Sequence, residues 1–354
     1  MKNTLKKAKT QRTKNADRSR ASVFGLWALL FACTALFTFG CGESSQTTAG
    51  RARDRVSAVR LTPQAMRIVM ASLADKDPPV RSSGIEVVAA TKQLRLMPKV
   101  QRLMRDQIAP VRFLAILAVG DLQYALGEND LKLLLKDKDE NVRIAAAYAL
   151  SKLGRTQYAK IFYNAITSKD QTVRANAALL LGKSGDQTAL AYLRRALQSR
   201  DSHDKVLLQA VESIAMLGDE QILQRLWGMV YSGYADDRIM GIRAMGALGT
   251  SKAKDILITK LDDDVLEVRL AAAGQLGKLN DPIGQPQVLE VFTKNLTAGM
   301  DRRDLERVKV LTALAIGEIG TDSLLAFLPQ LLQDESKFVR LAAAKAVFQY
   351  VMRR

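Results

Sequence analysis

Aspartate and arginine residues recur through the chain as pairs separated by six positions. In an enzyme, charged groups held close together can perturb each other's pKa and take part in proton transfer or substrate binding. A substrate is bound once, however, whereas a contact that joins structural repeats is needed at every junction, so the recurrence favours a structural role. The pairs are Asp75 with Arg81, Asp106 with Arg112, Asp137 with Arg143, Asp263 with Arg269, and Asp334 with Arg340.

Residues suited to metal binding or nucleophilic catalysis are few. His203 is the only histidine and lies in a polar stretch, residues 200–204, where we expect it to be solvated. Cys33 and Cys41 are the only cysteines, so the rest of the chain can form neither a thiolate metal site nor a disulfide. The single histidine offers no serine or cysteine a general base, and no GxxxxGK[ST] phosphate loop occurs. We therefore expect no metal, no cofactor and no enzymatic activity.

The elements that carry the charged pairs repeat along the chain. The sequence numbers of four Val-Arg dipeptides rise in equal steps of 31, and each dipeptide opens a stretch rich in alanine and leucine. A period of this size is typical of stacked helical repeats. Equivalent positions further on follow in steps of 33, 34, 28, 40 and 31, which makes nine units. The repeat positions are Val80–Arg81, Val111–Arg112, Val142–Arg143, Val173–Arg174, Val206–Leu207, Met240–Gly241, Val268–Arg269, Val308–Lys309 and Val339–Arg340.

Each unit is expected to be a hairpin of two antiparallel helices. The second helix keeps apolar residues at positions 0, +4, +7, +8 and +11 from the valine, which form one stripe along a helix. First helices are expected to begin at Asp186, at Asp219 and, in the first unit, at Thr62 with Pro63 in the opening turn. A left-handed residue is expected to end the second helix at position +12. Glycine or asparagine stands at this position as Gly154, Gly185, Gly218, Asn280 and Gly320.

These hairpins resemble HEAT repeats, in particular the short type found in phycobilin lyases. The last unit follows the pattern closely, including Pro329 in its first helix. The resemblance covers residues 61–354 and implies an all-α, right-handed α-solenoid of about nine HEAT-like helical hairpins, which we expect to form an elongated rod. It also implies that the Asp and Arg side chains form a hydrogen-bonded ladder through the stack. The ladder is expected to lapse throughout the sixth and eighth units and at two further places, Ser168 with Arg174 and Asp201 with Leu207.

Two activities of HEAT-like proteins follow from the resemblance as possibilities for this chain. Metal-dependent hydroxylation relies in such proteins on repeated His-Glu pairs that hold two irons, and this sequence has no such pair. We therefore do not expect that activity. Accessory work in chromophore or cofactor attachment, as in the phycobilin lyases, needs no such pairs and stays open.

The N-terminus has the layout of an export signal. Residues 1–20 carry eight Lys or Arg against one Asp and supply +7 of the net charge of +17, and residues 21–41 carry no charge. The end of this apolar segment resembles a bacterial lipoprotein signal, which implies lipidation at Cys41, although its length would also suit an uncleaved membrane anchor. Residues 42–60 are expected to be a flexible linker. Both interpretations place the repeats on the periplasmic side, whereas a core helix in a cytosolic protein is the alternative.

A group of basic residues, Lys99, Arg102 and Arg105, lies at helical spacing in the second unit. It could contact anionic lipid headgroups, lipopolysaccharide or an acidic protein face, or be an ordinary solvated surface. A nucleic-acid binder would be expected to have basic residues on its inner helices too, and the +6 positions, which we expect to be exposed there, do not show them. They are Glu86, Leu117, Tyr148, Leu179, Glu212, Gly246, Gly274, Leu314 and Lys345.

Two further groups are candidates for partner binding. Trp227, Tyr231 and Tyr234 fall at i, i+4 and i+7 in the sixth unit, where they could anchor a partner segment, although such a stripe is also typical of a core-facing helix surface. The stretch that leads into the eighth unit is longer than the others. Arg302 and Arg303 lie in this insertion, and insertions in repeats often carry function.

The last repeat ends with an apolar face that we expect to be exposed. Phe348 and Met352 lie there, and because a terminal repeat usually needs a polar outer face, they suggest self-association. The sequence as a whole predicts a non-catalytic scaffold for protein–protein interaction that is exported and tethered to the membrane. An accessory protein for chromophore or cofactor attachment and a cytosolic nucleic-acid binder are the alternatives.

Overall fold

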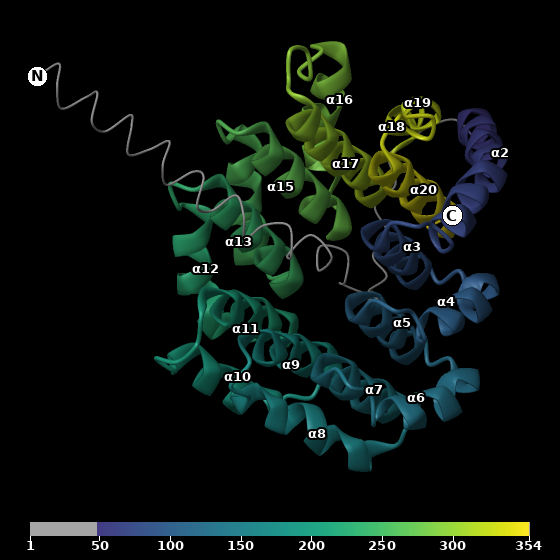
Figure 1. Cartoon of the computed structure of the whole chain (residues 1–354). Helices are drawn as coiled ribbons and strands as arrows, with labels where there is room; N and C mark the ends of the chain where they lie inside the picture. The colour runs from purple at the N-terminus through teal and green to yellow at the C-terminus, as the bar shows by residue number, and fades with distance from the viewer. Residues whose placement is uncertain (1–47, 354) are drawn as a thin grey trace, which may run out of the picture.

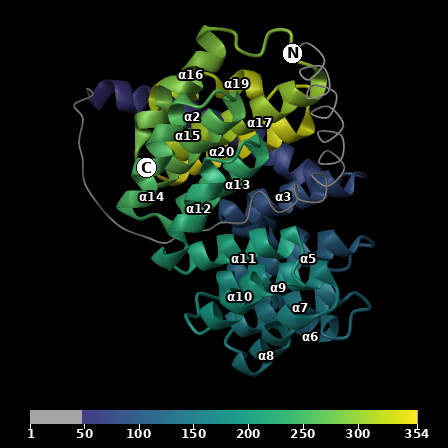
Figure 2. The same cartoon turned by 90° about the vertical axis from the view of Figure 1, so that its left-hand side faces the viewer.

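The computed structural model describes residues 48–353 of the chain, and in this range it is built from helices with no strand. Helical hairpins follow one another, with one helix of each pair on the inside of the stack and the other on the outside (Figure 1). The expected all-α solenoid of about nine HEAT-like hairpins is confirmed. Figure 2 shows the same stack turned by 90°, with the middle hairpins α5 to α11 below the first and last ones.

The inner helices supply most of the buried apolar side chains. They mostly begin after an extended residue and end close to position +12. The inner helices are α3 (Pro78–Ala90), α5 (Ala109–Asp121), α7 (Glu140–Lys152), α9 (Gln171–Ser184), α11 (Asp204–Met216), α13 (Ala235–Leu248), α15 (Leu266–Lys278), α17 (Arg302–Ile319) and α20 (Lys337–Met352).

The outer helices are mostly shorter, and 3-10 turns begin or end several of them. The outer helices are α2 (Thr48–Ser72), α4 (Met97–Leu103), α6 (Glu128–Leu134), α8 (Ala159–Asn164), α10 (Ala189–Gln198), α12 (Leu223–Val230), α14 (Ser251–Thr259), α16 (Gln285–Thr293), α18 (Asp322–Leu325) and α19 (Leu328–Leu331). The 3-10 turns are η3 (Leu94–Leu96), η4 (Ala125–Gly127), η5 (Thr156–Tyr158), η6 (Ala165–Thr167), η7 (Glu220–Ile222), η8 (Lys260–Asp262) and η9 (Pro282–Gly284).

The left-handed residues expected at position +12 are all found, with φ between 60° at Asn280 and 88° at Gly154. The same conformation also occurs at Lys92 and Gln123, which are neither glycine nor asparagine. In the sixth unit the left-handed residue is Gly249, with φ 67°. Because this residue occupies position +12, position 0 of the sixth repeat lies three residues before Met240. The register expected from the sequence for the sixth unit is therefore wrong.

The start of the first hairpin also differs from expectation. Helix α2 begins at Thr48, so residues 48–60, expected to belong to a flexible linker, are helical. Pro63 lies inside α2, and Thr62 is therefore not the cap of a helix that starts there. The start expected at Asp219 is found, because Asp219 caps η7 by accepting a hydrogen bond from the Gln221 amide at 3.1 Å. Asp186 accepts one from the Thr188 amide at 2.9 Å, but α10 begins only at Ala189, so Asp186 is not the cap of this helix.

Glycine lets neighbouring inner helices approach each other closely. A Cβ added at Gly120 in α5 would lie 2.7 Å from the Cα of Ala149 in α7, and one added at Gly277 in α15 would lie 2.6 Å from the main-chain nitrogen of Ile319 in α17. Both separations are well inside carbon contact distance. Close spacing on the inner side curves a stack of hairpins, and this curvature accumulates from repeat to repeat. Glycine recurs at this place as Gly120, Gly182, Gly246, Gly277 and Gly317.

The curvature brings the last hairpin back to the first, so the stack is a closed ring and not the elongated rod that we expected. Helix α20 packs against both α2 and α3, and the three lie together in Figure 1. We call this contact the seam. The Lys337 ammonium donates to the Asp75 carboxylate at 2.7 Å, and the Gln64 side chain donates to the Leu332 carbonyl at 3.5 Å.

Candidate functional site

Where the ladder is complete, it joins an inner helix to the next repeat by two kinds of contact. At the first junction, Nη1 of Arg81 donates to the main-chain carbonyl of Asp75 at 2.8 Å, which secures the loop of its own repeat. The Nε and Nη2 atoms of the same guanidinium donate to the carboxylate of Asp106, in the following repeat, at 2.7 and 2.9 Å. The aspartate six positions earlier therefore offers its carbonyl, whereas the carboxylate partner comes from the next repeat.

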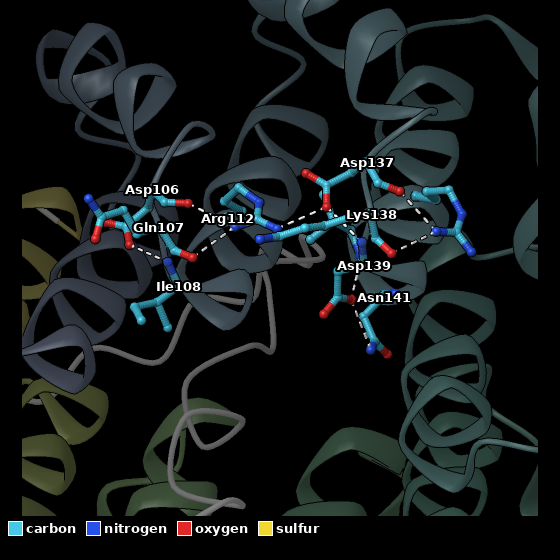
Figure 3. A network of polar contacts seen from close by, with 10 residues as sticks. Asp106, Gln107, Ile108, Arg112, Asp137, Lys138, Asp139 and Asn141 are labelled. Atoms are coloured by element: carbon cyan, nitrogen blue, oxygen red, sulfur yellow. Dashed lines mark hydrogen bonds and ion pairs between the residues drawn. The ribbon is translucent and has the colours of Figure 1, made fainter.

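The second junction repeats this arrangement (Figure 3). Arg112 donates to the Asp106 carbonyl at 2.8 Å and to the Asp137 carboxylate at 2.9 Å. The two side chains are only 6% and 11% exposed, so this ion pair is largely removed from water. Asp137 also accepts from the Asp139 amide at 2.9 Å, and Asp139 in turn caps α7 by accepting from the Asn141 amide. One carboxylate thus fixes both the neighbouring repeat and the start of its own inner helix.

The expected lapse of the ladder in the sixth unit is wrong. Arg238 donates to the Ser232 carbonyl at 3.1 Å and to the Asp263 carboxylate at 2.8 Å. Because the register of this unit was assigned incorrectly, Arg238 was not recognised as the ladder arginine. The expected lapse in the eighth unit is wrong as well, because Lys309 donates to the Asp334 carboxylate at 2.7 Å and a lysine there replaces the arginine.

Elsewhere the ladder is weaker. Arg174, which has Ser168 in place of the aspartate, donates to the hydroxyl of Ser202 at 2.8 Å and to the carbonyl of Asp201 at 3.1 Å. Three ladder arginines keep the main-chain contact of their own repeat, and within residues 48–353 we find no carboxylate from a following repeat that reaches them. They are Arg143, Arg269 and Arg340, which donate to the carbonyls of Asp137, Asp263 and Asp334.

The aromatic cluster, which we define as Trp227, Tyr231 and Tyr234, lies on the surface of the outer side. The three residues are 56%, 51% and 71% exposed, so their expected alternative place in the core is wrong. The buried face of α12 is made instead by Leu226 and Val230, each 0% exposed. The Trp227 and Tyr231 rings meet edge to face, with centroids 5.6 Å apart.

The next repeat supports the position of the Tyr231 ring. The Lys260 ammonium lies 3.8 Å from the ring centroid, at the distance of a cation–π contact. The Tyr231 hydroxyl lies 3.2 Å from the Thr259 hydroxyl, within hydrogen-bond distance. The aromatic cluster is therefore held by a neighbouring hairpin although it is open to solvent.

The basic groups differ in how far they are neutralised. Arg105 donates to the Asp130 carboxylate of the next hairpin at 2.6 Å, Arg102 is exposed, and Lys99 is half-buried. The three do not form one free cationic patch. Arg302 and Arg303 are exposed in the first turn of α17, where Asp301 caps the helix by accepting from the Arg303 amide at 2.9 Å. The part of the insertion that contains Arg302 and Arg303 is therefore the first turn of a helix and not a loop.

The +6 positions, expected to be exposed on the inner helices, are mostly buried. Leu117, Tyr148 and Leu179 are at most 3% exposed, because the inner helices of the closed ring pack on one another. Glu86 is 5% exposed, and its carboxylate makes no hydrogen bond with any of the residues that the structure describes. Burial raises the pKa of Glu86 well above its usual value, although the positive charge of Lys345 opposes this shift.

The C-terminal face is not open as expected. Phe348 is 2% exposed because α20 packs against α2 and α3, whereas Met352, at 50%, remains at the surface. The seam therefore covers most of the apolar face on which the expected self-association rested.

Among residues 48–353 no group of three or more His, Cys, Asp and Glu side chains is arranged to hold a metal ion, and His203 is exposed. No helix within those residues combines the length and apolar character needed to cross a bilayer. Cys41 and the segments 1–20 and 21–41 lie outside the described residues.

Comparisons with known proteins bear on the class of fold. Models of HEAT repeats match residues 131–157 and 159–239, and no curated protein matches the chain. The chain therefore contains HEAT repeats, and its fold is an α-solenoid.

Several solved structures have a similar arrangement of helices. The complex of CpcE and CpcF of phycocyanin lyase from Nostoc sp. is similar at 17% identity and a TM-score of 0.40, over 70% of this chain and 93% of that one. Human deoxyhypusine hydroxylase is similar at 17% identity and a TM-score of 0.36, over 74% and 98%. The karyopherin Kap121p is similar at 18% identity and a TM-score of 0.34, with 79% of this chain covering 37% of that one.

Proposed function

We propose that the protein is a non-catalytic scaffold that binds a protein partner through the aromatic cluster on α12 and the turn after it. The observation that carries the proposal is the exposure of Trp227, Tyr231 and Tyr234 on the outer surface. Tryptophan and tyrosine supply much of the binding energy in protein interfaces, because they bury a large area with few rotatable bonds.

The surroundings of the aromatic cluster favour a partner segment that combines an apolar side chain with negative charge. Arg225 is exposed on α12 and supplies positive charge beside the rings. Lys260 lies against the Tyr231 ring but is buried and lies 3.9 Å from the Asp263 carboxylate. Outside residues 1–20 the chain keeps a net charge of +10. Positive charge at the rim of an interface speeds the approach of an acidic partner, whereas the rings supply the anchoring contact.

The test expresses variants of the full chain in the native host, crosslinks them chemically, and compares the proteins captured by a double variant and by a single control variant. Trp227→Ala with Tyr234→Ala removes the two most exposed rings. Tyr192→Ala is the matched control, because Tyr192 is 42% exposed on the outer helix α10 and its ring packs on Tyr163. We expect the double variant to lose a defined partner by at least tenfold and the control to retain it. If the double variant captures the same proteins in the same amounts, the proposal fails.

We further propose that the scaffold is exported and tethered to the membrane through its N-terminus. The support is the order of the N-terminal sequence, in which a basic stretch, an apolar stretch and Cys41 follow one another. Intact-mass measurement on the membrane fraction tests it. A diacylglyceryl group on Cys41 supports lipidation, an unprocessed Met1 supports an uncleaved anchor, and a full-length chain in the soluble fraction contradicts both.

A further inference from the structure

A pocket of about 340 Å³ opens at the seam between the first and last hairpins. Its charged lining comes from three cations, Arg67 of α2 with Lys337 and Arg340 of α20, and from one carboxylate, that of Asp75. Its apolar wall includes Ile68. The pocket therefore combines an excess of positive charge with an apolar surface.

The charge excess comes from the way in which the ladder closes around the ring. At several other junctions a ladder arginine meets the carboxylate of the following repeat, as Arg81 meets Asp106 and Arg238 meets Asp263. The repeat that follows Arg340 around the ring is the first one. The carboxylate of that repeat, Asp75, is taken by Lys337 at 2.7 Å.

The guanidinium of Arg340 is consequently left with main-chain partners. It donates from Nη1 to the carbonyls of Asp334 and Glu335, and among the described residues it makes no ion pair. Arg67, which belongs to α2, is exposed and makes no ion pair within the same range. Two guanidinium groups thus line one pocket, at a junction where the carboxylate of the next repeat already pairs with Lys337.

We propose that the seam pocket binds a small organic acid, with its carboxylate on Arg340 and Arg67 and a short apolar chain against the wall that contains Ile68. A carboxylate fits a guanidinium through two parallel hydrogen bonds, which is the contact that Arg81 makes to Asp106. The carboxylate of the ligand would take at the seam the place that the Asp106 carboxylate takes beside Arg81. A volume of about 340 Å³ is at the small end of ligand pockets, so the ligand is a small molecule.

The apolar part of the lining distinguishes an organic acid from inorganic phosphate. Both anions can meet the guanidinium groups, but phosphate has no apolar group to bury against Ile68 and Leu341. The pocket is therefore expected to prefer a monocarboxylate to inorganic phosphate.

The test is calorimetric titration of the full chain with butanoate, butanol and inorganic phosphate at neutral pH. We expect butanoate to bind, and butanol and phosphate to bind at least tenfold more weakly. Arg340→Gln should weaken butanoate binding by about tenfold or more, because it removes a charge-assisted hydrogen bond. Arg67→Gln, a change at an exposed position, should weaken it as well.

Arg269→Gln is the matched control. Arg269 holds the same ladder position, donates to the Asp263 carbonyl at 2.7 Å and belongs to α15, away from the seam in the ring. Its replacement should leave butanoate binding unchanged. The proposal is overturned if butanoate does not bind, if phosphate or butanol binds as tightly, or if Arg269→Gln weakens butanoate binding as much as Arg340→Gln and Arg67→Gln do.

Discussion

Replacement of Asp137 by alanine should destabilise the protein much more than replacement of a nearby solvent-exposed carboxylate. Asp137→Ala leaves the guanidinium of Arg112, 6% exposed, without its carboxylate, and it leaves the Asp139 amide without its acceptor. Removal of one member of a buried ion pair costs roughly 3–5 kcal/mol. Because Asp137 is 11% exposed and water can partly reach the site, we expect about 3 kcal/mol.

Glu140→Ala is the matched control for this change. Glu140 pairs with Arg143 at 4.0 Å, and the two side chains are 44% and 36% exposed. An exposed pair of this kind contributes about 0–1 kcal/mol. The control should therefore shift the unfolding midpoint only slightly.

The assay is urea unfolding followed by far-ultraviolet circular dichroism, with the free energy of unfolding taken from the midpoint and the slope. A third variant, in which Arg112→Met is added to Asp137→Ala, should recover part of the loss, because it removes the uncompensated buried charge. If Asp137→Ala costs no more than Glu140→Ala, the structural interpretation of the Asp and Arg pairs is refuted. If the double variant is less stable than Asp137→Ala, the buried charge is not the cause of the loss.

Three further predictions concern the curvature and the seam. Gly277→Ala should lower the free energy of unfolding by about 1–2 kcal/mol in thermal melts, because the overlap with Ile319 outweighs the gain in helix propensity; an unchanged or higher melting temperature would contradict the close approach. Phe348→Ala should cost about 3–5 kcal/mol in urea unfolding and Met352→Ala less than about 1 kcal/mol, since only the first is buried; equal costs would mean that the seam is open in solution. Hydrogen bonds, first that of Lys337, lower the pKa of Asp75, so its contribution to stability is present above the pKa of the unfolded state, about 4, and is lost as the pH falls through the lower folded value. Melting temperatures measured from mildly to strongly acidic pH should therefore fall less for Lys337→Ala than for the unchanged protein, and parallel curves would exclude the contact.

The regular period was enough to predict the hairpins, because a repeat must place the same apolar stripe against each neighbour. It failed in the sixth unit, where Met240 was aligned by its apolar character although Arg238 and Gly249 define the register. An arginine near the start of a helix is not distinctive by itself. The left-handed glycine that ends the helix is the signal that would have corrected the alignment.

The pairing within the ladder could not be read from the sequence. A spacing of six positions suggested a side-chain pair inside one repeat, but Arg112 binds the carbonyl of Asp106 and the carboxylate of Asp137, which belongs to the next repeat. The second contact depends on how neighbouring hairpins are oriented. That orientation is set by packing and not by local sequence.

Closure of the ring was also missed, although a sequence signal for curvature existed. Glycines recur nine positions after the repeat position, as at Gly120 and Gly277, and each marks a close approach of inner helices. The direction of bending could have been inferred from them. Whether the ends meet depends on the sum of all the inter-repeat angles, which no single motif encodes.

The closed ring changes how the protein can lose its structure. A linear array frays from its two terminal repeats, because each of them has a neighbour on one side only. Here α20 lies against α2 and α3, so the first and last hairpins have neighbours on both sides, and unravelling must begin with a rupture at the seam or at an internal junction. A circular permutant that links the end of α20 to the start of α2 and opens the chain between two other hairpins should keep the same ring. In this permutant the seam would be joined by a peptide linker.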